Sequence, residues 1–335
     1  MSSSNTPGFR TSKIFRPRLA AVAATALLGA TALTACGDDS GAAASAGDKL
    51  GVVAAFYPLQ FVAERVGGDA VSVTNLVKPG AEPHDLELNP QQVGQLTDAQ
   101  LVVYLKGFQP AVDEAITQNN AARSFDASTA VPLLSGSEHA HEHEGEAEEE
   151  HAEEEEHAEE EEGGTDPHLW LDPTRLATVA DAVAGKLAEA DPDHAADYTA
   201  RAAALRTELT ALDTEFSTGL QTCERREIVT SHTAFAYLAD RYKLEQIGIS
   251  GISTEDEPSP QRLAEVAAEA KEHGATTIFF ETLVSPKLAE TIAQEVGAKA
   301  EVLDPLEGLA DGATGDYFTV MRTNLASLKT ALSCS

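Results

Sequence analysis

The sequence has few basic residues for its length. It contains 23 Lys and Arg against 55 Asp and Glu, so its formal net charge at pH 7 is −32. A chain with this charge is repelled by phosphate backbones and by anionic lipid surfaces. We therefore exclude nucleic acid as a partner, and any attachment to a membrane must depend on something other than surface charge.

Cysteine is also scarce, with only Cys36, Cys223 and Cys334 in 335 residues. A chain of this length can bury enough apolar surface to fold without disulfide bonds. In an oxidising compartment two cysteines are more often bridged than free. We expect a Cys223–Cys334 disulfide that pins a C-terminal helix to the first strand of the second half. The alternative is two buried free thiols.

Long apolar runs are missing except at residues 19–33. Four basic residues precede this run, and the segment Leu33-Thr34-Ala35-Cys36 ends it. This pattern is typical of a bacterial lipoprotein signal. We expect residues 1–35 to be removed, Cys36 to carry lipid, and 36–48 to form a flexible tether, which places the protein outside the cytoplasm on the cell membrane. The alternative, an uncleaved span, is disfavoured because the run is shorter than the ~20 residues that a bilayer requires.

One segment, 138–162, is almost entirely charged. It holds fifteen Glu, no Lys or Arg, and the five histidines His139, His141, His143, His151 and His157. A segment without large apolar side chains is expected to be a disordered insertion. An acidic spacer is the plainest interpretation, but the interleaved imidazoles favour metal binding.

Outside this tract, short β-branched runs alternate with helical patterns, which predicts an α/β fold with two lobes, each a mostly parallel sheet covered by helices. The predicted strands are 50–55, 71–77, 101–105, 227–230, 244–249, 276–280 and 300–303. The helical patterns at 173–190 and 194–220 predict a long, rigid backbone helix between the lobes. We place the N-terminal lobe at 49–190, the linking helix at 191–222 and the C-terminal lobe at 223–335.

Four side chains stand where α/β folds place ligands, beyond the carboxyl ends of strands or at the entry to a helix. His84 lies in PHDLELNP, His168 in DPHLWLDP, His232 ends IVTSH, and Asp304 ends EVLDP. Each histidine alone would more often be a surface or core residue. Together, three imidazoles and one carboxylate suit a tetrahedral Zn²⁺ site.

At these motifs the chain resembles the ZnuA-type receptors of zinc and manganese ABC importers. The matching segments are PHDLELNP, DPHLWLDP, SHTAFAYLADRY, IFFETLVSP and LDPLEGL, and the His/Glu-rich tract also lies where zinc-selective members have one. The resemblance implies a metal site in the cleft between the lobes, formed by His84, His168, His232 and either Asp304 or water. It implies that Glu82 and Glu281 lie beside the ligands. It also implies delivery to a membrane permease and its ATPase, and we expect a monomer.

The residue types favour Zn²⁺ over Mn²⁺, because imidazole suits zinc and carboxylate-rich sites suit manganese. Manganese-selective relatives tend to have Glu where this chain has His232. Two other classes of protein remain as alternatives. A zinc hydrolase would need a general base, for which Glu281 is the first candidate, but the sequence lacks HExxH. A surface adhesin with a structural zinc would unfold on chelation.

Overall fold

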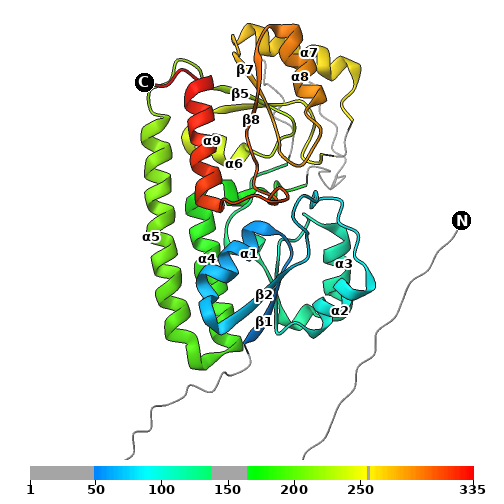
Figure 1. Cartoon of the computed structure of the whole chain (residues 1–335), viewed down its shortest axis with the longest axis vertical. Coiled ribbons are helices and arrows are strands. Elements are labelled where there is room, and N and C mark those ends of the chain that lie inside the picture. Colours follow the sequence, from blue (N-terminus) through cyan, green and yellow to red (C-terminus); the bar gives the residue numbers. More distant parts are fainter. Residues whose placement is uncertain (1–48, 137–163, 255–256) are drawn as a thin grey trace, which may run out of the picture. The chain divides into compact units, whose positions relative to one another are not determined.

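Four parallel strands form the first sheet, in the order β2-β1-β3-β4 (Figure 1). The strands are β1 (Leu50–Ala54), β2 (Val71–Asn75), β3 (Leu101–Tyr104) and β4 (Ser124–Asp126). Helices α1 (Tyr57–Gly67), α2 (Pro90–Asp98) and α3 (Pro110–Asn119) connect them. The central strands β1 and β3 are almost entirely buried, as expected for a parallel sheet covered on both faces.

The computed structural model describes residues 49–136, 164–254 and 257–335. The predicted signal, the predicted lipidation site Cys36, the predicted tether and the His/Glu-rich tract lie outside the described residues. The described residues between Ala46 and Ser335 belong to one compact unit. None of the helices in these ranges is long and apolar enough to cross a membrane.

The second sheet repeats the strand order of the first, as β6-β5-β7-β8. Its strands are β5 (Glu227–Thr230), β6 (Glu245–Gly248), β7 (Thr277–Phe280) and β8 (Lys299–Val302), with helices α6 (Ala236–Tyr242), α7 (Pro260–Glu272) and α8 (Lys287–Val296) between them. All neighbouring strands are parallel. The prediction of two parallel sheets covered by helices is therefore confirmed. The sequence patterns missed β4, which has only three residues, and α3.

Two helices, α4 (Pro173–Ala190) and α5 (Ala195–Gly219), form a hairpin beside the sheets (Figure 1). The Asp191 carboxylate stabilises the turn by accepting hydrogen bonds from the His194 ring and the Tyr198 hydroxyl, both at 2.7 Å. Helix α5 reaches elements of both halves. Asp213 on α5 pairs with Arg241 on α6, and α5 also packs against α1. The predicted linking helix is α5, and α4 packs along it as a second helix.

The last helix, α9 (Tyr317–Ala331), lies against α5. A disulfide joins Cys223, just before β5, to Cys334, just after α9. Beside it, the Ser335 N–H donates to the Thr222 carbonyl at 2.9 Å and the Glu224 N–H donates to the Leu332 carbonyl at 3.0 Å. The predicted bridge is confirmed, and it holds the end of the chain against the start of the second sheet.

Short 3-10 turns complete the described elements, at Gly68–Ala70, Ala121–Arg123, Ala127–Ala130, Leu169–Leu171 and Pro192–His194. The turn at Leu169–Leu171 lies inside the core, and its Trp170 is 1% exposed. Asp172 caps the following helix α4 by accepting from the Thr174 N–H at 2.8 Å. This capped entry fixes the segment that carries His168.

Candidate metal centre

Four potential metal ligands from distant parts of the chain converge in the described structure: His84, His168, His232 and Glu307. His84 follows β2, His168 precedes α4, His232 follows β5 and Glu307 follows β8. One ligand atom from each lies within 4.8 Å of all the others. The carboxyl ends of the two sheets and the entry to α4 therefore meet at one point.

The Glu307 carboxylate is the centre of this group. Its Oε1 lies 3.1 Å from Nε2 of His168, 3.1 Å from Nε2 of His232 and 3.4 Å from Nε2 of His84. The two Nε2 atoms of His168 and His232 are 3.4 Å apart. A tetrahedral zinc ion has ligands at about 2.0 to 2.2 Å, so its ligand atoms are about 3.3 to 3.6 Å apart. These four separations are close to that range, and all the ligand atoms lie within 4.8 Å of one another.

Asp304 does not join the group, and Glu307 takes the place that we expected it to fill. The Asp304 Oδ1 accepts from the Leu306 N–H at 2.7 Å, and its Oδ2 accepts from the Thr282 hydroxyl at 2.9 Å. An Asp side chain that bonds the backbone two residues on forms a local turn. Leu306 then adopts a left-handed backbone with φ of 59°, and the next residue, Glu307, reaches the histidines.

The Asp166 carboxylate contacts the His168 ring on the side opposite to Glu307. Nδ1 of His168 lies 2.7 Å from Oδ1 of Asp166, which also accepts from the His168 N–H at 2.8 Å. The Asp166 carbonyl accepts from the Tyr237 hydroxyl at 2.7 Å, so helix α6 braces this segment. We did not single out Asp166 from the sequence. The available signal was an acid two residues before a histidine in a segment stiffened by proline.

His232 is held in the same way by Glu281, whose Oε1 lies 2.6 Å from Nδ1 of the ring. Glu281 follows β7, the strand next to β5, so the two side chains leave adjacent strand ends. His232 is 1% exposed and Glu281 4% exposed. A carboxylate on the far nitrogen fixes the tautomer of an imidazole and directs the other nitrogen toward a metal.

His84 has a different setting, because its ring packs against Phe108 with centroids 4.4 Å apart. Its side chain is 8% exposed, whereas that of His168 is fully buried. Two residues earlier, Glu82 has one carboxylate oxygen bonded to the Asp85 N–H at 3.3 Å. Burial and the nearby Glu307 charge raise the pKa of Glu82 to about 7.

The charges in this group are strongly coupled. Burial alone would lower the pKa of His168 and of His232, but the carboxylates beside each ring outweigh burial and raise both. Burial alone would raise the pKa of Glu307, but the three imidazoles hold it well below its usual value. The carboxylates therefore favour the protonated forms of His168 and His232, and a cation that binds Nε2 of these rings would compete with those protons.

A family model of the periplasmic zinc-uptake complex component A, ZnuA, matches residues 52–331 of this chain. The chain belongs to the ZnuA family. A ZnuA-family relative from Bacillus subtilis (strain 168), the high-affinity zinc uptake system protein ZnuA, is 38% identical over 310 residues, covering 90% of this chain and 93% of the relative. The zinc-binding lipoprotein AdcA of Streptococcus pneumoniae serotype 4 is 34% identical over 304 residues, covering 89% of this chain and 58% of AdcA.

Solved structures that are similar to this chain have the same fold. A crystal structure of ZnuA superposes with a TM-score of 0.71 at 32% identity, covering 85% of this chain and all of that one. The laminin-binding protein Lmb of Streptococcus agalactiae also has a TM-score of 0.71 at 32% identity, covering 85% and 99% of the two chains. Lmb is described as bifunctional, with adhesin and metal-transporting activity.

Proposed function

We propose that this chain is the extracytoplasmic receptor of a zinc importer, which binds Zn²⁺ and delivers it to an ABC permease and its ATPase. The observation that carries the proposal is the convergence of His84, His168, His232 and Glu307 within 4.8 Å. Membership of the ZnuA family supports zinc as the cargo and transport as its purpose. Zinc is then the cargo of the receptor rather than a resident cofactor.

In this proposal, Nε2 of each histidine and one oxygen of Glu307 bind the ion. Asp166 and Glu281 accept the Nδ1 protons of His168 and His232, which leaves the Nε2 lone pairs free for the metal. Metal binding at Nε2 of His168 and His232 competes with the protonation of these rings that Glu307 favours. Three imidazoles and one carboxylate favour Zn²⁺ over Mn²⁺, which prefers oxygen ligands.

A receptor explains this site better than a hydrolase does. A catalytic zinc keeps three protein ligands and an open position for water. Here Glu307 supplies a fourth protein ligand, and Glu281, the first candidate for a general base, lies 2.6 Å from Nδ1 of His232. Glu281 is thus placed to orient an imidazole rather than to activate water.

We further propose that lipid on Cys36 anchors the mature protein to the outer face of the cell membrane and that it acts as a monomer. The lipobox-like segment Leu33-Thr34-Ala35-Cys36 supports the anchor, as does the description of a relative, AdcA, as a lipoprotein. An anchored receptor stays close to its permease. Labelling cells with a fatty-acid probe, with Cys36→Ser as the control, tests this attachment.

Zinc and manganese binding to the purified protein tests the proposed function. We expect one tightly bound Zn²⁺ per chain at the site, measured by competition with a chromophoric chelator, and little displacement by a large excess of Mn²⁺. His194→Ala is the matched control, since His194 is exposed and bonded to the helix turn at Asp191. Failure of the metal-free protein to take up stoichiometric zinc would overturn the proposal.

A further inference from the structure

The loop that carries Glu307 is hydrogen-bonded on both sides to segments of the first half of the chain. On one side, the Trp170 indole N–H donates to the Pro305 carbonyl at 2.7 Å. On the other side, the Gly80 N–H donates to the Leu309 carbonyl at 2.8 Å. Pro305 and Leu309 each lie two residues from Glu307, so these two contacts fix the loop immediately before and after the carboxylate.

Both contacts begin on segments that carry histidines of the cluster. Trp170 lies two residues after His168, and its ring is 5.3 Å from the His168 ring. Gly80 lies four residues before His84, and it adopts a φ of 79° that L side chains rarely take. Two hydrogen bonds therefore connect the loop of Glu307, the only carboxylate of the cluster, to the segments that carry His168 and His84.

Trp170 is the more tightly held of the two donors. It is 1% exposed, and its ring lies 4.9 Å from Phe56 and 5.4 Å from Phe108, which itself contacts His84. The Tyr317 hydroxyl donates to the Trp170 carbonyl at 2.7 Å. The indole thus has little freedom to follow Pro305 if the loop shifts, and a shift would leave its buried N–H without a partner.

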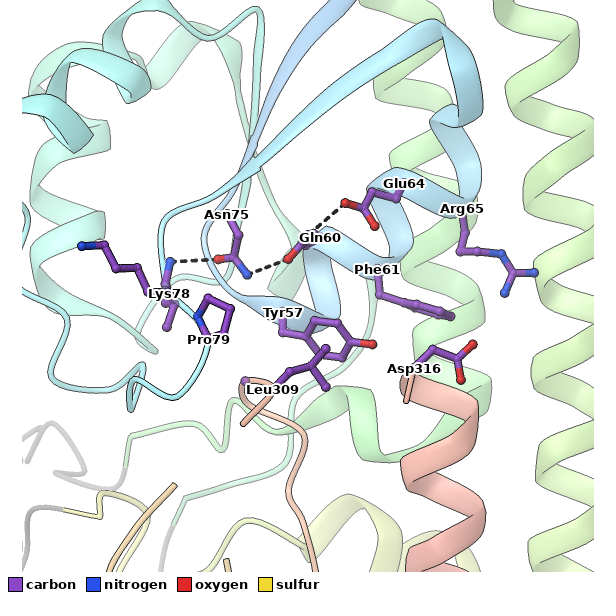
Figure 2. A pocket seen from close by; sticks show the side chains of 12 residues that line it. Tyr57, Gln60, Phe61, Glu64, Arg65, Asn75, Lys78, Pro79, Leu309 and Asp316 are labelled. Carbon is purple, nitrogen blue, oxygen red and sulfur yellow. Dashed lines mark hydrogen bonds between the residues drawn. The ribbon is translucent and has the colours of Figure 1, made fainter. Parts of the chain in front are cut away.

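The Gly80 contact lies beside a surface groove of about 550 Å³ (Figure 2). Lys78 and Pro79 from the His84 segment line this groove together with Gly308 and Leu309 from the Glu307 loop. Tyr57 and Phe61 of α1 supply apolar lining. The Gly80 side of the loop is therefore near solvent, whereas the Trp170 side is in the core.

We infer that Trp170 is a positioning residue, whose indole N–H holds the Glu307 carboxylate in register with the three imidazoles and so slows release of the bound cation. It does not touch the ion. Removing the N–H while keeping an aromatic ring would leave the buried Pro305 carbonyl unpaired and free the loop on its core side. This inference rests on the proposed cargo site.

The test compares zinc dissociation from the parent protein and from Trp170→Phe, by rapid mixing with an excess of a chromophoric chelator. We expect about tenfold faster release from the variant, which corresponds to about 1.4 kcal/mol. Tyr198→Phe is the matched control, because it removes a partly buried aromatic hydrogen bond to Asp191 on the distant helix turn. Its zinc release should equal that of the parent.

A double variant separates positioning from general loosening of the fold. In a Glu307→Gln background, Trp170→Phe should add no further change in zinc affinity, although it should still lower the thermal midpoint. An equal loss of affinity in both backgrounds, or parent-like release from Trp170→Phe, overturns the inference. If Trp170→Phe does not fold, Tyr317→Phe takes its place, because it removes the hydrogen bond to the Trp170 backbone carbonyl. We expect this variant to speed zinc release by a smaller factor. Parent-like release from it also overturns the inference. If the parent itself binds no zinc, the proposed function fails instead.

Discussion

The two sheets share one strand order but differ in how they are packed. The strands of the first sheet belong to the large core that also includes α4, α5 and α9. The second sheet has a smaller core of its own beneath α7 and α8, built around Val229, Ile247 and Ile278. Its edge strand β8 is half-exposed, with Val302 38% exposed. The first sheet therefore packs in the large core alone, whereas the second sheet is divided between two cores, because its Ile228 and Phe279 also belong to the large one.

The metal cluster uses the two halves differently as well. The second sheet presents His232 and Glu281 from neighbouring strand ends and Glu307 from the loop after β8. The first half presents His84 from a long loop and His168 from the entry to α4. His168 and His232 each have a carboxylate on Nδ1, whereas His84 packs against Phe108. Two sheets with the same strand order can therefore supply ligands of unequal rigidity.

The largest expected effect comes from removing a rigid imidazole. Complete structural zinc sites are worth about 10 to 16 kcal/mol, so one ligand of four is worth about 3 to 4 kcal/mol, or on the order of 10² to 10³ in affinity. We expect His232→Ala to lose at least this much and His84→Ala to lose less, because His84 is less tightly fixed. Chelator competition measures both. Equal losses would mean that the carboxylate partners add no rigidity, and unchanged affinity in both variants would remove the site assignment.

Replacing the fourth candidate ligand, Glu307, is expected to cause the next largest loss of zinc affinity. Glu307→Gln should weaken zinc binding by about a hundredfold, since it removes the only charge-neutralising ligand of the cluster. Asp304→Asn, three residues earlier, should weaken zinc binding far less, because the Asn side-chain oxygen can still accept from the Leu306 N–H and keep the turn that precedes Glu307. The opposite ranking would restore Asp304 as the ligand.

This pair of residues also marks the limit of what the sequence predicts. Both carboxylates lie in LDPLEGL, and the strand-end rule selects the first of them. The rule fails because the Asp304 side chain accepts a hydrogen bond from its own loop. The sequence alone does not show whether such a carboxylate bonds the nearby backbone or a metal. By contrast, strand pattern and Pro-flanked loops were enough to predict both sheets and the three convergent histidines. Asp166 was missed because its role depends on a ring orientation that only the fold defines.

Removing the disulfide tests how far the second sheet depends on a covalent anchor for its stability. Cys223 and Cys334 are 111 residues apart, and removing a native disulfide of this kind typically costs about 2 to 5 kcal/mol. We expect Cys223→Ser with Cys334→Ser to lower the free energy of unfolding by about this amount in urea, with no change in zinc affinity at 25 °C. A fall in affinity would show that the anchor also holds the metal ligands in place.

The residues behind the imidazoles give a smaller effect. Replacing a carboxylate that orients a metal-binding histidine typically costs 10- to 100-fold in affinity, roughly. We expect Glu281→Gln and Asp166→Asn each to fall in this range. Glu227→Gln is the control, because that carboxylate faces His273 at 3.3 Å, away from the cluster. If Glu281→Gln binds zinc like the parent, the contrast between His232 and His84 has another cause.

The smallest effect on the tight site is expected from the His/Glu-rich tract, 138–162. Its five imidazoles can bind metal only by ordering their backbone, which costs on the order of 1 kcal/mol per residue, so the tract should bind zinc more weakly than the cluster does. Among the described residues on either side of the tract, the Gly136 N–H donates to the Gly164 carbonyl at 2.6 Å, and Asp166 and His168 follow Gly164 closely in sequence. We expect the fifteen glutamates to attract cations a few residues in sequence from the cluster.

We therefore expect the tract to act on capture rather than on final affinity. Changing its five histidines to Gln should slow cellular zinc accumulation under scarcity and reduce the number of weakly bound ions, while the tight site keeps its affinity. The intact protein and a deletion of 138–162 are the two controls. The His→Gln variant keeps all fifteen glutamates and loses only the imidazoles, whereas the deletion removes both. Equal uptake and equal stoichiometry in all three proteins would make the tract a passive spacer. Slower uptake in the deletion alone would assign capture to the glutamates, which attract any divalent cation, rather than to the histidines.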